Sequence, residues 1–258
     1  MSFVAAFRFL TVIPLPFGRV ASEREIGRSL TYFPVVGLAI GLVLAAFYIL
    51  LNAILPTSLV SAFVIVGMVL INGALHMDGF IDTFDGLAGN KTPEERWSVM
   101  KDSRVGAFGL VAGVLLLLLK YLSLSSIPRV LAPASLVIMP AIARWCMVYA
   151  ITGYPYAKPS GLGTLFKHGA SWRRFWIVSA LTVVISCFTL WLGGVAYFYV
   201  AGVVIIAAVW LVTFAWAHYL SHEFAGLTGD SYGAVSELAE VVVLVIVVML
   251  TYNRWVGM

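Results

Sequence analysis

The sequence predicts an all-α, polytopic integral membrane helical bundle with about seven transmembrane helices and a polar site at the cytoplasmic face. Hydrophobic residues make up 62% of the 258 residues and charged residues only 11%, whereas a soluble domain carries about 25% charged residues. The mean hydropathy is +1.00. We found no internal repeat or separate soluble segment, so we expect residues 1–258 to form a single integral membrane domain.

Seven apolar runs approach the length of about 20 residues that crosses the hydrocarbon core of a bilayer. Pro56 closes the first run, and the second leads directly into an acidic segment. Pro133 and Pro140 are expected to bend the fourth run, because proline disrupts the helix that precedes it. Gly193 and Gly194 separate the fifth run from the sixth. The predicted spans are residues 31–55, 58–77, 107–127, 131–152, 175–192, 195–217 and 235–252.

The N-terminal residues 1–17 are apolar but do not resemble a cleavable signal peptide. Arg8 lies inside the apolar stretch, and no small-residue cleavage site follows it. We therefore expect a short amphipathic or re-entrant element at this end of the chain.

Charged residues are distributed very unequally between the two ends of the predicted spans. Twelve basic residues fall on one side, and only Arg129 and Arg254 fall on the other. The positive-inside rule places the crowded side in the cytoplasm. All 12 acidic residues and all four histidines also lie on or near that side. We therefore expect a multi-pass protein of the cytoplasmic (inner) membrane whose active site faces the cytoplasm. The one-sided distribution favours an enzyme over a transporter, because a transporter would line a path across the bilayer with polar groups.

Three carboxylates lie close together just after the second predicted span. Asp78, Asp82 and Asp85 are spaced by four and then three residues, which places them on one face of a helix. Like charges in this arrangement repel one another unless a cation lies among them. Mg²⁺ takes carboxylate oxygens and leaves positions for water and substrate phosphate. The triplet therefore predicts a Mg²⁺ site, and the alternative is a solvated helix end with three acids.

Two basic residues follow a short predicted helix in the same loop. Thr92 and Glu95 are spaced as a capping box, which predicts that this helix begins at Pro93. Lys101 and Arg104 come at its far end, three residues apart. They suit a phosphate-bearing ligand near the metal, although ordinary positive-inside charge explains them equally well.

Two further basic residues lie inside predicted spans. Arg144 is several residues deep in the fourth span, where a charge is costly and usually faces a cavity or a partner. We expect Arg144 to contribute to substrate binding. Lys120 lies nearer the sparsely charged side, so we expect it to extend outward to the membrane surface in a structural role.

A second group of acids surrounds the start of the last predicted span. Glu237 and Glu240 share a helix face in its first turns, and Asp230 precedes them. A helix N-terminus favours anions, but two acids entering a membrane helix need a cation nearby. We expect this group to converge with the Asp triplet on one cavity. There it would supply further metal ligands, Glu237 first and then Glu240, or bind Lys101 and Arg104, while Asp230 would contact substrate.

Three motifs carry most of the polar residues, namely HMDGFIDTFDGL at 76–87, MKDSRVGAFG at 100–109 and LTGDSYGAVSELAE at 227–240. In order and spacing they resemble motifs of the cobalamin synthase family, the adenosylcobinamide-GDP ribazoletransferases. The early segments FRFLTVIPLP and YFPVVGLAIG are similar to the N-terminal region of that family. The resemblance covers essentially the whole chain. It implies a Mg²⁺-dependent membrane enzyme that joins alpha-ribazole or its 5'-phosphate to adenosylcobinamide-GDP and releases GMP.

The resemblance and the residues together predict one mechanism. The ribose 3'-hydroxyl would attack the phosphate attached to cobinamide, and GMP would leave. Mg²⁺ held by the Asp78 triplet would neutralise the pyrophosphate. Asp82, Asp85 or His76 would accept the hydroxyl proton.

An alternative reading is a CDP-alcohol phosphotransferase-like membrane enzyme of phospholipid synthesis, which uses a similar pattern of acids and glycines. The Ala-Arg and later Asp-x-x-x-Asp elements of that motif are missing after Asp78-Gly79. The basic pI of about 9.1 is accounted for by membrane orientation, so we expect no nucleic-acid partner. The sequence leaves open whether the protein forms an oligomer.

Overall fold

The computed structural model of the chain describes residues 1–15, 20–158 and 161–253. Residue 254 and residues 16–17, which carried sequence predictions, lie outside these ranges. The described residues form helices and contain no strand; one isolated bridge joins Tyr156 to Leu227. The helices are α1 Ser2–Leu10, α2 Glu23–Ser29, the 3₁₀ helix η1 Leu30–Tyr32, α3 Phe33–Asn52, α4 Thr57–Ile71, α5 Leu75–Leu87, α6 Pro93–Met100, α7 Ala107–Ser126, α8 Ala132–Gly153, α9 Leu162–Gly169, α10 Trp172–Leu192, α11 Phe198–Glu223 and α12 Gly229–Tyr252.

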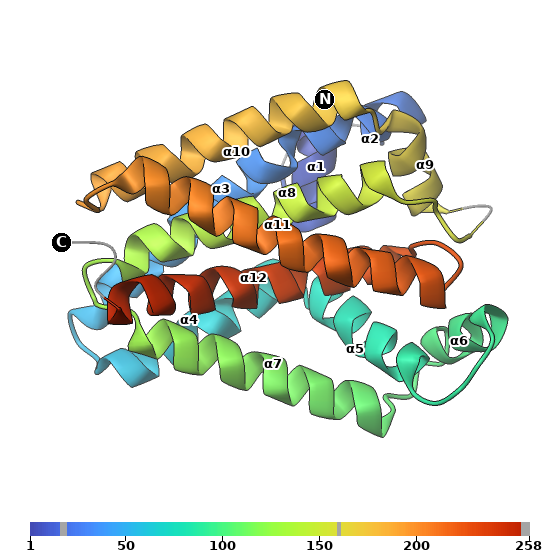
Figure 1. Ribbon diagram of the computed structural model, residues 1–258, viewed down its shortest axis with the longest axis horizontal. Coiled ribbons are helices and arrows are strands. Elements are labelled where there is room, and N and C mark those ends of the chain that lie inside the picture. Colours follow the sequence, from blue (N-terminus) through green and yellow to red (C-terminus); the bar gives the residue numbers. More distant parts are fainter. Residues whose placement is uncertain (16–19, 159–160, 254–258) are drawn as a thin grey trace.

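The long helices lie side by side along the long axis of the molecule, and the short helices α2, α6 and α9 gather at one end (Figure 1). Within the described residues, six helical segments are long and apolar enough to cross a membrane: residues 23–52, α7, α8, α10, α11 and α12. The polytopic helical fold is therefore confirmed. The α1 helix, nine residues long, is too short to span, as expected of the N-terminal element.

The second predicted span, residues 58–77, is wrong as a single straight helix. Helix α4 ends at Ile71, α5 begins at Leu75, and the two are bent by 89°. Gly73 and Ala74 adopt left-handed backbone conformations with φ of 59° and 57°. This conformation ends a right-handed helix, so α5 takes a new direction and carries the Asp triplet. A seventh crossing exists only if the bent pair is counted as one span.

Helix α8 forms the centre of the bundle, and nearly all of its residues are buried. It continues past Pro140, and Pro133 lies in the first turn, where a missing backbone donor costs nothing. Helix α3 packs closely against it through Gly37 and Gly41. A Cβ atom at Gly37 would lie 2.5 Å from the carbonyl oxygen of Pro140, so only glycine allows the two backbones this approach.

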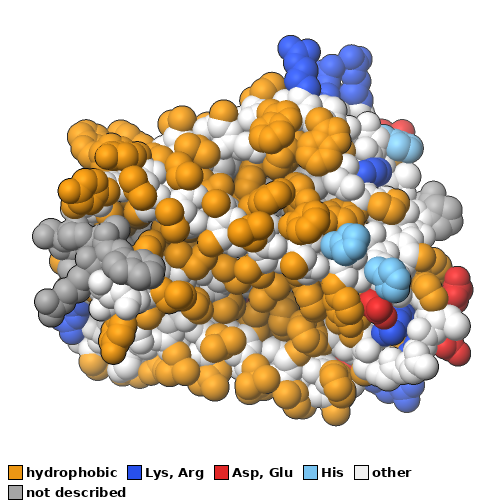
Figure 2. Space-filling view, viewed as in Figure 1, with side chains coloured by type: hydrophobic (Ala, Val, Ile, Leu, Met, Phe, Trp, Pro, Cys, Tyr) orange, Lys and Arg blue, Asp and Glu red, His pale blue; other side chains and the backbone are white. Residues whose placement is uncertain are grey.

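The charged end of the molecule brings two distant loops together. On the face shown in Figure 2, most charged side chains gather toward the end where α2, α6 and α9 lie, and apolar side chains predominate elsewhere, with a basic side chain visible at the opposite end. Arg96 of α6 forms an ion pair with Glu223 of α11, with 2.7 Å between Nη2 and Oε2. Trp97 donates a hydrogen bond to the Phe224 carbonyl oxygen at 3.1 Å. The loops near residues 78–106 and 218–234 therefore lie at the same end, as predicted.

Candidate active site

Helix α5 packs along the start of α12, which brings two of the sequence motifs together. The contact depends on two glycines. A Cβ atom at Gly79 would lie 2.8 Å from the carbonyl oxygen of Asp230, and one at Gly233 would lie 3.0 Å from that of His76. Because neither position has a side chain, the backbones approach closely and the polar residues beside them share one pocket.

This pocket has a volume of about 240 Å³ and lies between α5, α12, α9 and the loop after α8. Apolar residues of α1, α8 and α9 form part of its wall. Its ionisable or hydrogen-bonding lining consists of His76, Asp78, Tyr156, Lys158, Asp230 and Tyr232. The expected convergence of the two acid groups is therefore found, but through Asp78 and Asp230 rather than through Glu237.

Acids outnumber bases around this pocket. Asp82, one turn after Asp78 on α5, is half-buried, and the charges of Asp78, Asp230 and Asp85 all repel its own. The cation that lines the pocket is Lys158, whose Nζ lies 3.6 Å from Oδ2 of Asp230. One lysine leaves the negative charge of three carboxylates incompletely balanced, which is the electrostatic condition for binding an added cation.

The loop that carries Lys158 is held against the start of α12. The Ala157 amide donates to the Leu227 carbonyl oxygen at 2.9 Å, and the Leu227 amide donates to the Pro155 carbonyl oxygen at 2.8 Å. Burial, and then the negative charge of Asp230, raise the pKa of the Tyr156 hydroxyl in the same loop. Tyr156 therefore stays protonated and able to donate a hydrogen bond into the pocket.

His76 is the most deeply buried titratable group in the pocket wall, with 2% of its surface exposed. Neither of its ring nitrogens has a hydrogen-bond partner among the described residues, and the same holds for the Tyr232 hydroxyl. Buried polar groups normally have partners. These orphaned atoms mark the pocket as a place where a ligand or ordered water completes the hydrogen bonding.

Asp85 differs from the other two members of the triplet. Both of its carboxylate oxygens accept backbone hydrogen bonds at 2.7 Å, one from the Gly106 amide and one from the Gly109 amide. A Cβ atom at Gly109 would lie 2.5 Å from Oδ2 of Asp85, so glycine is needed there. Asp85 thus anchors the N-terminus of α7 to α5, where the helix dipole favours an anion. This bonding disfavours its predicted roles as metal ligand and catalytic group.

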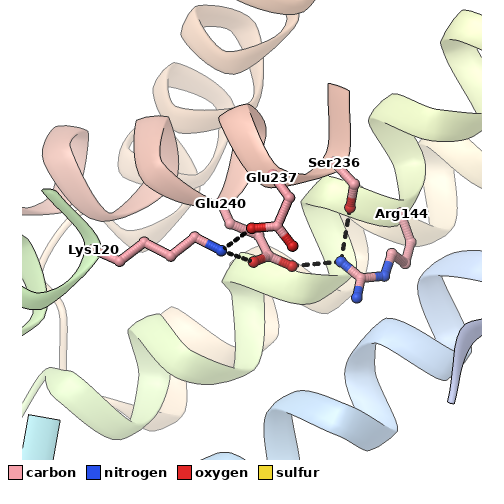
Figure 3. Close-up of polar contacts among 5 residues, drawn as sticks. All are labelled: Lys120, Arg144, Ser236, Glu237 and Glu240. Atoms are coloured by element: carbon pink, nitrogen blue, oxygen red, sulfur yellow. Dashed lines mark hydrogen bonds and ion pairs between the residues drawn. The ribbon is translucent and has the colours of Figure 1, made fainter. Parts of the chain in front are cut away.

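Glu237 and Glu240 lie deeper along α12, in a charge network that is buried between α7, α8 and α12 (Figure 3). Lys120 Nζ lies 2.6 Å from a carboxylate oxygen of each glutamate. Arg144 pairs with Glu240 and donates a hydrogen bond to Ser236 at 2.8 Å. Two acids and two bases balance one another, so the network supplies its own cations.

The network changes three sequence predictions. Lys120 does not extend to the membrane surface; its side chain is 0% exposed and points inward to the glutamates, because an ion pair inside the protein is less costly than an isolated charge in lipid. Glu237 and Glu240 are paired with bases and do not line the pocket that holds Asp78. Arg144, predicted to bind substrate, is also fully buried and lies outside the pocket lining.

The predicted phosphate-binding pair lies at the surface. Arg104 has 87% of its side chain exposed and pairs with Asp102 at 2.6 Å, and that guanidinium lowers the pKa of Asp102 to about 2. Lys101 is also exposed, and neither residue lines the pocket. Residue spacing does not identify Lys158 as a site residue, because only the long-range pairing of its loop with Leu227 places it beside Asp230.

The donors around the pocket suit a hard divalent cation. No three described His, Cys, Asp or Glu side chains come close enough together to hold a metal by themselves. Mg²⁺ does not need such a cage, since it usually takes one or two protein carboxylates and completes its shell with water and substrate phosphate. Asp78, Asp82 and Asp230 supply such oxygens and lack enough basic neighbours, so the residues present fit Mg²⁺.

Comparison with known proteins identifies the family. A family model described as cobalamin-5-phosphate synthase matches residues 2–248. The chain belongs to this family. Relatives named adenosylcobinamide-GDP ribazoletransferase include one from Geotalea daltonii, 38% identical over 246 residues that cover 95% of this chain and 96% of the relative. One from Thermoanaerobacter pseudethanolicus is 35% identical over 243 residues, or 94% of each chain. No solved structure is significantly similar to the chain.

The motifs that contribute to the pocket all lie within the matched region. The family result agrees with the resemblance of residues 76–87 and 227–240 and favours it over the phospholipid-synthesis alternative. The pocket between α5 and α12 is therefore the candidate active site of a cobalamin-5-phosphate synthase family member.

Proposed function

We propose that the protein is an adenosylcobinamide-GDP ribazoletransferase. In the reaction, the 3'-hydroxyl oxygen of alpha-ribazole or its 5'-phosphate forms a bond to the phosphorus attached to cobinamide. The bond between that phosphorus and the bridging oxygen of the pyrophosphate breaks, and GMP leaves with the electron pair. The products are adenosylcobalamin or its phosphate, GMP and the hydroxyl proton. The observation that carries this proposal is the family match over residues 2–248.

The residues that line the pocket, and Asp82 one turn along α5 from Asp78, have distinct roles in this reaction. Asp78, Asp82 and Asp230 would hold one or two Mg²⁺ ions, which neutralise pyrophosphate charge when bound. Lys158 contacts a phosphate oxygen as a mobile point charge, and Tyr156 donates a hydrogen bond beside it. Asp82 or His76 accepts the 3'-hydroxyl proton, and both ring nitrogens of His76 lack partners in the described structure.

The orientation in the membrane is part of the proposal. Both substrates are water-soluble, one of them carries a guanosine nucleotide, and the basic residues are concentrated at the pocket end of the molecule. We place the protein in the cytoplasmic membrane with the pocket open to the cytoplasm. Lys101 and Arg104, exposed at that same end, would meet the guanosine-bearing phosphate only outside the pocket.

The direct test incubates membranes carrying the protein with adenosylcobinamide-GDP, alpha-ribazole and Mg²⁺ and measures GMP by chromatography. The proposal predicts that GMP appears in step with the cobalamin product and that chelation of Mg²⁺ abolishes both. Membranes carrying Asp82→Asn are the matched control. Release of CMP from CDP-diacylglycerol and an alcohol, without GMP release from the cobinamide substrate, would instead support the phospholipid-synthesis alternative.

A further inference from the structure

A second cavity lies next to the candidate active site, under helix α1. It has a volume of about 290 Å³, is partly open to the surface, and is lined mainly by α1, α2 and α9. Its lining is mainly apolar and includes Val4, Ala5, Phe9, Ile26, Leu162 and Phe166. None of the three polar motifs and none of the proposed catalytic residues lies in it, although Arg8 and Phe9 belong to the N-terminal segment FRFLTVIPLP.

The two cavities share a wall. Phe9, Leu162 and Phe166 line both the apolar cavity and the pocket that holds Asp78 and Asp230. The rings of Phe9 and Phe166 have centroids 4.7 Å apart, and Phe33 packs behind them at 5.9 and 5.6 Å. A ligand with a polar part in the pocket therefore needs to pass only this aromatic wall to place an apolar part in the cavity.

Three polar side chains at the edge of the apolar cavity, those of Arg8, Glu25 and Ser29, already have bonds within the protein. The Arg8 guanidinium donates to the Leu15 carbonyl oxygen at 3.4 Å. The Glu25 carboxylate accepts from both the amide and the hydroxyl of Ser22, at 2.9 and 3.0 Å. The Ser29 hydroxyl is likewise bonded to a backbone carbonyl. The cavity thus offers apolar and aromatic contact in preference to hydrogen bonds.

This chemistry distinguishes between the two ring systems of the substrates. Guanine carries several donors and acceptors, and burying them without partners costs free energy. The dimethylbenzimidazole base of ribazole has no donor when it is glycosylated, and it adds two methyl groups to an aromatic bicycle. Apolar area and stacking against phenylalanine rings favour the second ring system.

We propose that the cavity under α1 binds the dimethylbenzimidazole base of alpha-ribazole, with the ribose extending past Phe9 and Phe166 into the catalytic pocket. This inference rests on the proposed function, because it assigns a subsite to one of the two substrates. It makes Ala5, Ile26 and Phe166 specificity-determining residues for the base.

The first experiment introduces a larger side chain at Ala5 and compares two nucleosides in the GMP-release assay. The unaltered protein should show a KM roughly tenfold lower for alpha-ribazole than for the riboside of unmethylated benzimidazole, a typical discrimination for missing methyl groups. Ala5→Leu should remove or reverse this preference and leave the KM for adenosylcobinamide-GDP unchanged. Ala180→Leu, at an exposed position of α10, is the matched control and should preserve the preference.

Two outcomes of this experiment would overturn the inference. One is a raised KM for adenosylcobinamide-GDP in Ala5→Leu with an unchanged KM for alpha-ribazole, which would show that the cavity binds the guanosine. The other is unchanged discrimination between the nucleosides. Absence of GMP release from the unaltered protein would contradict the proposed function itself and is therefore distinguishable from both.

A binding experiment tests the subsite without turnover. In purified Ala5→Cys protein, the rate of modification by a thiol reagent should fall at least severalfold when alpha-ribazole is added, and GDP should have no such effect. The unaltered protein, whose Cys146 is buried and Cys187 half-buried, gives the background. Protection by GDP but not by alpha-ribazole, or by neither, would contradict the proposal even if Ala5→Leu failed to fold.

Discussion

Two groups of acids, one shared between α5 and the start of α12 and the other deeper along α12, have their negative charge balanced in opposite ways. Around the pocket, Asp78, Asp82 and Asp230 have one lysine among them and remain partly open to solvent. Deeper along α12, Glu237 and Glu240 are closed off from solvent and matched by two basic side chains. Acids balanced by the protein stabilise the packing of helices, whereas acids left unbalanced at a pocket are available to an external cation.

Depth in the bundle explains the difference. An unpaired charge in the apolar interior is very costly, so the buried glutamates persist only with Lys120 and Arg144 beside them. At the pocket, water reaches the carboxylates and reduces the cost of their repulsion. The two groups should therefore respond differently to loss of a single charge.

The largest expected effect is on catalysis at the open group. Asp78→Asn and Asp82→Asn should each lower kcat by about a hundredfold or more, since a bound metal stabilises the transition-state charge by several kcal/mol. Thermal stability in detergent should stay the same or rise, because each change removes a repelling charge. Near-normal turnover in both variants would show that these acids do not hold the metal.

The next effect is on stability at the closed group. Lys120→Met leaves two buried glutamates with one remaining base and should destabilise the protein by about 3–5 kcal/mol. Adding Glu237→Gln to Lys120→Met should recover much of that loss, because one acid and Arg144 then balance. Thermal unfolding of the purified variants measures both, with Lys101→Met as an exposed control. A Lys120→Met protein as stable as the original would contradict the network.

Much of the fold could be predicted from local patterns. Apolar runs located the long helices, the capping box from Thr92 to Glu95 is present with hydrogen bonds of 2.8 and 3.4 Å, and the spacing of Asp78, Asp82 and Asp85 placed them on one helix. The break before α5 is marked in the sequence only by Asn72-Gly73, a dipeptide typical of turns, and Ala74 gives no indication of its left-handed conformation. The positions of the helices could be predicted because they depend on residues that are close together in the sequence.

The ion-pair and hydrogen-bond partners of individual charged residues could not be predicted from local sequence patterns. Lys120 could extend to either side of its span, and only the packing of α7 against α12 directs it inward. By spacing alone, Asp85 is equivalent to Asp78. In the structure, the amides of Gly106 and Gly109 donate hydrogen bonds to both carboxylate oxygens of Asp85. Long-range packing decides which acid is bonded and which is free, and that packing is absent from residue spacing.

A smaller effect separates the pocket lysine from the surface pair. Lys158→Ala should reduce kcat/KM by roughly tenfold to a hundredfold, the equivalent of one charge-assisted hydrogen bond. Arg104→Ala should change it by less than about threefold, because an exposed pair contributes little. Steady-state kinetics with adenosylcobinamide-GDP measures both. The reverse ranking would restore Lys101 and Arg104 as the main phosphate ligands.

The smallest effect is a coupling between variants. Asp230→Asn combined with Asp82→Asn should cost less than the sum of the single changes in the free energy of activation, since the charge of Asp230 acts on Asp82. Glu237→Gln combined with Asp82→Asn should be additive within about 0.5 kcal/mol. If Glu237→Gln and Asp82→Asn were coupled while Asp230→Asn and Asp82→Asn were additive, the glutamates rather than Asp230 would belong to the active site.

The most direct test of this distinction is a Mn²⁺ titration followed by electron paramagnetic resonance, with adenosylcobinamide-GDP present and ribazole absent so that no turnover occurs. Mn²⁺ takes the same oxygen ligands as Mg²⁺. Asp82→Asn and Asp230→Asn should weaken Mn²⁺ binding at least about tenfold, as expected for loss of a ligand or its support, whereas Glu237→Gln should leave the affinity unchanged. Unchanged affinity in both aspartate variants, with a loss in Glu237→Gln, would contradict the account.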